Sequence, residues 1–129
     1  MRKTAVLPED HTTTWTDINA ADRPMRDLLR QLPCLQTDGQ GNVDYANSDR
    51  AIVAATGQNA SCMASALHMG IGAIGHLLAT SAPQIEDGSV DSDAVEALGW
   101  LIAELGDLGA ELAVMAIQCR RHMGNAPKT

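Results

Sequence analysis

The feature that most constrains this chain is a long run, residues 51–85, that contains no Asp, Glu, Lys or Arg. Within it apolar residues recur at intervals of three and four, which places them on one face of a helix. Ser48 supplies an N-cap and Pro83 ends the pattern, so we predict a helix over residues 48–82 that Gly57 kinks. The repeating positions are Ala60, Met63, Leu67, Ile71, Ile74 and Leu78.

Residues 91–123 show the clearest helix signature in the sequence. Asp91 predicts the N-cap, and the basic residues of the last turn, before Gly124, favour the negative end of the helix dipole. The acidic turn 83–90 is short, so the two long helices are expected to form an antiparallel hairpin. The repeating apolar positions of this second helix are Val95, Leu98, Ile102, Leu105, Gly109, Leu112, Ala116 and Cys119.

The N-terminal part completes a single domain spanning residues 1–129. Residues 1–21 lack periodicity and predict an extended arm. A short helix follows over 22–32, capped by Asp22, with Pro24 in its first turn. Its apolar face consists of Met25, Leu28, Leu29 and Leu32.

Residues 33–47 predict a loop that contains two turn signals, with Leu35 paired to Val43. Asp38 and Asp44 lie within it and resemble an oxygen-ligand loop. The pattern of a calcium-binding loop, in which a glycine at a fixed position is followed by a distal glutamate, is missing, however, so we interpret the segment as a polar turn.

Stripes of small residues lie beside the apolar faces of both long helices. Glycine inside a helix costs about 1 kcal/mol relative to alanine, so several glycines at regular spacing indicate close helix packing. We expect Gly72, Gly75, Gly99 and Gly106 to provide that packing within the hairpin. The stripes are Ser61, Ser65, His68, Gly72, Gly75 and Ala79 in the first helix, and Gly99, Ala103, Gly106, Ala110 and Ala113 in the second.

Close packing of these stripes would leave the larger apolar faces open, because the short helix is too short to cover them. A second copy of the chain would cover them and complete a four-helix bundle. The sequence therefore predicts an all-α fold and a homodimer. The core or dimer seam consists of Leu98, Ile102, Leu105, Leu112, Met63, Leu67, Ile74 and Leu78.

Composition excludes several classes of protein. The net charge of −7 argues against direct nucleic-acid binding. Three widely spaced cysteines do not suggest a disulfide scaffold, so we expect a cytoplasmic protein. The uncharged run has the length of a membrane span, but it carries two histidines and lacks flanking aromatic belts. We therefore expect no membrane insertion.

No arrangement of residues predicts catalysis or a cofactor. The string Gly70–Gly75 matches a dinucleotide fingerprint, but it lies inside a predicted helix rather than after a strand. Ser65 and His68 have no nearby carboxylate to orient the imidazole. Cys119 and His122 share a helix face and form a soft-ligand pair, which leaves open the alternative of a metal- or small-ligand-binding bundle.

The most suggestive surface is an outer ridge of the second helix. It places Trp100 next to Glu104, Asp107 and Glu111, and an exposed tryptophan rimmed by acids is typical of a binding hot spot. We therefore expect a non-enzymatic interaction or regulatory module that binds a protein with a basic surface. By analogy this resembles accessory proteins of bacteria, phages and plasmids, including inhibitors of host complexes. The remaining alternative is an acidic DNA mimic that inhibits a nucleic-acid-binding protein.

Overall fold

The computed structural model describes residues 23–124. Within this range all the longer elements of secondary structure are helices. The prediction of an all-α fold is confirmed. The elements are α1 (Pro24–Gln31), a 3-10 turn (Leu32–Cys34), α2 (Arg50–Thr80), α3 (Ala82–Glu86) and α4 (Ser92–Gly124). The expected N-terminal arm, residues 1–21, and the expected cap Asp22 lie outside the described residues.

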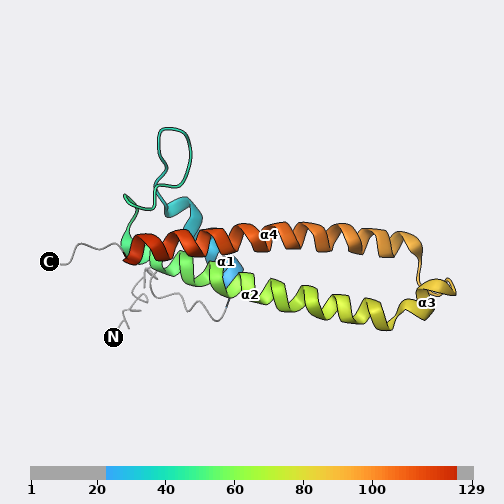
Figure 1. Cartoon of the computed structure of the whole chain (residues 1–129). Helices are drawn as coiled ribbons and strands as arrows, with labels where there is room; N and C mark the ends of the chain where they lie inside the picture. The colour runs from blue at the N-terminus through green and yellow to red at the C-terminus, as the bar shows by residue number, and fades with distance from the viewer. Residues whose placement is uncertain (1–22, 125–129) are drawn as a thin grey trace, which may run out of the picture.

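The two long helices, α2 and α4, run side by side in opposite directions (Figure 1). At one end Gly57 faces Cys119, and ten residues further along α2 Leu67 faces Gly109. Both contacts fit one antiparallel register, in which Glu104 lies level with Gly72. We call α2 and α4 together the helix pair.

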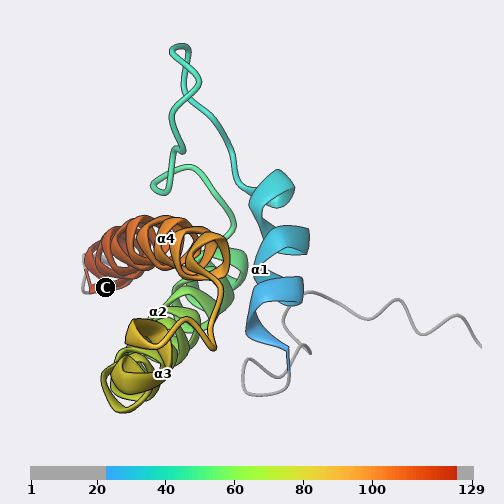
Figure 2. The ribbon, with the colours of Figure 1, turned by 90° about the vertical axis from the view of Figure 1, so that its right-hand side faces the viewer.

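Helix α1 crosses one side of the helix pair near the end where α2 begins (Figure 2). Leu28 is its anchor, because this side chain is buried in a cluster with Ala60, Leu112 and Ala116. A second cluster beside it consists of Leu35, Val53 and Cys119, with Tyr45 and other half-buried side chains packed against it. The core is therefore confined to one end of the molecule.

The rest of the helix pair has no comparable core. Not one residue from 61 to 111 is buried, and we call this stretch the distal segment. Its apolar side chains are at most half-buried, and several large ones are exposed, namely Met69, Leu77, Trp100, Leu101 and Leu108. No third element covers these exposed side chains in the described residues (Figure 1).

The boundaries of α2 differ from the expected ones. Asp49 rather than Ser48 caps the helix, because its carboxylate accepts hydrogen bonds from the backbone N–H groups of Ala51 and Ile52. Ser48 instead accepts a hydrogen bond from the N–H of Gln36 and donates one to the carbonyl of Asp44. Its hydroxyl therefore fastens the preceding loop.

The connection between the long helices also contains a helical turn that the sequence analysis missed. Pro83 lies in the first turn of α3, where a backbone N–H has no partner within the helix, so the missing N–H of proline costs nothing. Pro83 therefore follows the end of α2 and also favours the start of α3. Asp91 accepts a hydrogen bond from the N–H of Asp93 at the start of α4, as expected of the N-cap. In the loop before α2, Val43 pairs with Thr37 rather than with Leu35.

Gly57 does not interrupt α2, which is helical without a break from Arg50 to Thr80. A β-carbon at Gly57 would lie 2.7 Å from Cβ of Cys119, so the glycine allows α4 to approach closely. This is the kind of packing that the sequence analysis assigned to other glycines.

Those other glycines make no close contact within the chain. A β-carbon at Gly72, Gly75, Gly99 or Gly106 would have no atom of another element within 4 Å. The small-residue stripes are exposed, whereas the leucines and isoleucines of the predicted seam are half-buried or buried. The expectation that the stripes mate within the hairpin is thus wrong for the single chain, because larger side chains bury more apolar area there. We call the two exposed stripes together the small-residue face.

Candidate functional site

Trp100 extends from the outer ridge of α4, and 68% of its surface is exposed. Glu104, Asp107 and Glu111 are exposed as well, at the helical spacing that places them beside the indole. No described element covers this ridge. The structure therefore presents the predicted acidic, tryptophan-containing face to solvent.

Two leucines that the sequence analysis left out of this site widen it. Leu101 is 52% exposed and Leu108 is 38% exposed, and each lies on the flank of the ridge next to Glu104. We call Trp100, Leu101, Glu104, Leu108 and Glu111 the Trp100 patch. The exposure of both leucines follows from the position of α2, which the helical period alone does not give.

The residues predicted for the core or dimer seam are all at least half-buried. Leu112 belongs to the core, and Met63 and Leu67 pack against it. The other five are half-buried in the distal segment, namely Leu98, Ile102, Leu105, Ile74 and Leu78. Their half-burial distinguishes them from the exposed residues of the small-residue face.

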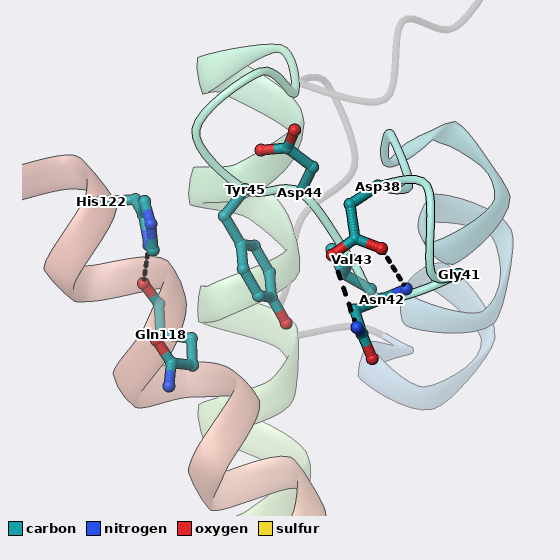
Figure 3. Close-up of a pocket in the computed structure, with 8 residues that line it drawn as sticks. All are labelled: Asp38, Gly41, Asn42, Val43, Asp44, Tyr45, Gln118 and His122. Carbon is teal, nitrogen blue, oxygen red and sulfur yellow. Dashed lines mark hydrogen bonds between the residues drawn. The ribbon is translucent and has the colours of Figure 1, made fainter.

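A hollow of about 770 Å³ lies between the 38–45 loop and the end of α4 (Figure 3). Figure 3 shows Asp38 and Asn42 on the loop side, with Gln118 and His122 on α4 opposite them. The Asp38 carboxylate accepts hydrogen bonds from the N–H groups of Gln40 and Asn42, and these bonds lower its pKa.

Both acids of this loop are used in turn formation. Asp44 accepts hydrogen bonds from the backbone and the side-chain amide of Asn47. With Asp38 also bonded to its own turn, the arrangement matches a polar turn rather than a set of ligands aimed at one ion.

Cys119 and His122 lie where the soft-ligand alternative requires them, but their surroundings differ from those of a metal centre. Cys119 is 1% exposed, and burial raises the pKa of its thiol to about 11, so the thiolate that binds metals is scarce at neutral pH. The His122 ring lies 5.6 Å from that of Tyr45, and its Nδ1 is 2.9 Å from the carbonyl of Gln118. Within residues 23–124 no three His, Cys, Asp or Glu side chains gather around one point.

Sequence reasoning missed a buried polar cluster where α1 meets α2. Asp27, Gln31, Thr56 and Asn59 are all fully buried. Asn59 Nδ2 donates a hydrogen bond of 3.0 Å to Gln31 Oε1, and Arg26 pairs with Asp27 at 2.7 Å. The available signal was the spacing, because Asp27 and Gln31 fall on the apolar side of α1 next to Leu28.

Helix α2 is long enough and apolar enough to cross a membrane, judged by length and composition alone. In a core helix of a soluble protein most residues are buried inside the protein. In the most apolar stretch of α2, by contrast, no residue is buried.

Comparison with models of protein families, with curated proteins and with solved structures found no match to this chain.

Proposed function

We propose that this protein is a non-enzymatic helical interaction module that binds a protein with a basic surface through the Trp100 patch. The observation that carries the proposal is the exposure of Trp100, at 68%, in the middle of a row of carboxylates. In this proposal the hairpin of α2 and α4 carries the patch on its outer side.

The energetics of the patch favour binding. A buried tryptophan contributes a large apolar area at a small cost in side-chain entropy, which is why tryptophan is enriched among interface hot spots. Trp100, Leu101 and Leu108 together supply such an apolar centre, and Glu104 and Glu111 supply its rim. Acids at a rim accelerate encounter with a basic partner more than they strengthen the final complex.

The charge distribution supports a basic partner in particular. Residues 86–111 contain eight acids and no Lys or Arg. The electrostatic potential around this part of the molecule is therefore negative. The expected cytoplasmic location is retained in the proposal, because Cys34, Cys62 and Cys119 are free thiols.

The experiment is affinity capture from a lysate of the source cells with the immobilised full chain, followed by direct titration of the captured protein. We expect Trp100→Ala to weaken that complex by about 30-fold or more, the loss of a typical hot spot of about 2 kcal/mol. Glu104→Lys is expected to slow association and to reduce its salt dependence.

Leu29→Ala is the matched control. Leu29 is 59% exposed and lies on α1, away from the patch, so its truncation removes exposed apolar area without touching the proposed site. Equal weakening by the control and by Trp100→Ala would contradict the proposal. Competition of the complex by DNA would instead favour the DNA-mimic alternative.

A further inference from the structure

We propose that a second copy of this chain binds the small-residue face, so that the distal segments of two chains form a four-helix bundle. This face lies on the other side of α4 from the Trp100 patch, so the inference goes beyond the proposed function and can fail independently of it. It also replaces the dimer surface that the periodicity suggested, because the larger apolar side chains already lie between α2 and α4.

The small-residue face carries no charged residue and contains a groove. None of its residues is Asp, Glu, Lys or Arg, whereas the acids of α4 recur on the adjoining ridge. Between the two stripes runs a groove of about 310 Å³, lined among others by His68 and Ile71 of α2 and by Gly106 and Ala110 of α4. Glycine and alanine at this face let the helices of a second copy approach closely, because no bulky side chain keeps the two backbones apart.

The glycines of this face are unexplained by the single chain. Gly72, Gly75, Gly99 and Gly106 have no neighbour that a β-carbon would meet, so alanine would fit at each and would favour the helix. A second helix pair resting on this face would meet those β-carbons. Close approach of two copies thus gives the glycines a role that the isolated chain does not.

The area of the face is sufficient for a specific dimer. From Ser61 to Ala79 the stripe of α2 extends about 28 Å at 1.5 Å per residue, and two adjacent helices are about 20 Å wide. Two copies in contact would therefore bury roughly 1,100 Å² in total even as flat surfaces, which exceeds the approximately 1,000 Å² expected of a specific interface. A two-fold axis brings the same face of each chain together.

A second copy fits this face better than a lipid bilayer does. In the register of the helix pair Glu104 lies level with Gly72, and Asp107 lies level with Met69. Insertion of α2 would carry these carboxylates to the hydrocarbon core, where each charge costs at least about 2.5 kcal/mol. In the bundle they remain on the outer ridge in water.

The test is sedimentation equilibrium of the full chain, from about 1 to 200 μM, as wild type and as two matched variants. Ala103→Leu adds bulk to the small-residue face, and Ala97→Leu adds the same bulk to the opposite flank of α4, next to Leu101. Both alanines are exposed and both changes preserve helix propensity. Helicity by circular dichroism checks that each variant folds.

We expect a wild-type dimer that Ala97→Leu retains and that Ala103→Leu weakens by about 100-fold, because the misfit occurs once in each copy. A wild-type monomer at the highest concentration would overturn the proposal. So would equal dimerisation of all three proteins, or loss of the dimer with Ala97→Leu alone. Binding of the wild type to phosphatidylcholine vesicles in place of self-association would assign the face to lipid.

Discussion

At the scale of the residue, two glycines of α2 have different roles. Gly57 is buried against Cys119, whereas Gly70 has open space where a β-carbon would be. Helix propensity favours alanine at both positions by about 1 kcal/mol. The surroundings decide the sign of the net effect.

We predict that Gly57→Ala destabilises the fold and that Gly70→Ala stabilises it. The new methyl at position 57 would be forced within 2.7 Å of Cβ of Cys119, and overpacking of this kind costs about 1–3 kcal/mol. At position 70 only the gain in helix propensity remains. Urea denaturation followed by circular dichroism measures both, and a stabilised Gly57→Ala would show that α4 does not approach α2 closely there.

Cys119 makes stability depend on pH in the alkaline range. Burial raises the pKa of its thiol from 9.0 to about 11, so the unfolded chain loses this proton at a lower pH than the folded chain does. The free energy of unfolding is therefore expected to be unaffected by this group below about pH 8 and to fall between about pH 9 and 11. Burial of Tyr45, whose pKa is also raised, adds a loss in the same direction above pH 10.

The measurement is the free energy of unfolding against pH for the wild type and for Cys119→Ala. The variant loses some packing at every pH, so the informative quantity is the slope between pH 9 and 11. We expect a shallower slope in the variant. Identical slopes would mean that the Cys119 thiol reaches solvent in the native state.

At the scale of the element, α1 is held to α2 by polar as well as apolar contacts. Gln31 and Asn59 are fully buried and bonded to each other, and each retains one amide atom without a partner among the described residues. Such a pair adds little net stability, but either residue alone would be a buried polar group without its partner. The hydrogen-bonded pair thus favours one position of α1 on α2 over other positions.

We predict strong coupling between these two positions in a double-mutant cycle. Asn59→Leu alone leaves Gln31 buried without its bond and should cost about 1–3 kcal/mol of unfolding free energy, and Gln31→Met alone should behave likewise. The double variant is expected to recover most of that loss, since both partners are then apolar. Additive losses would indicate that the amides do not interact in solution.

At the scale of the whole molecule, stability is concentrated at one end. The buried residues all lie between 27 and 60 or between 112 and 119, and the distal segment has none. An isolated helix pair without a buried core gains too little from packing to hold its helices firmly, because most helical stability in proteins comes from tertiary contacts. The distal segment is therefore the part whose order depends most on association.

Hydrogen exchange should show this gradient and its dependence on concentration. Below the dimer dissociation constant we expect backbone amides near Ala60 and Ala116 to be protected and those near Gly72 and Gly106 to exchange rapidly. Above it, protection should extend along the distal segment. Protection that is equal along α2 at both concentrations would show that the distal segment is stable without a second chain.

The sequence by itself determined the elements and the identity of the exposed ridge. Period and caps are local properties, so the long helices, the Asp91 cap and the row from Trp100 to Glu111 follow from neighbours along the chain. The cap of α2 shows the limit, because Ser48 and Asp49 are both good caps, and the loop contact with Gln36 engages the serine.

Only the tertiary structure decided which face of each helix is inside. The apolar stripe and the small-residue stripe have the same period, so the sequence offers both as the interface of the pair. The larger side chains take it because they remove more apolar area from water. That choice exposes Gly72 and Gly106 while placing Gly57 against Cys119, and it depends on a contact between residues far apart in the chain.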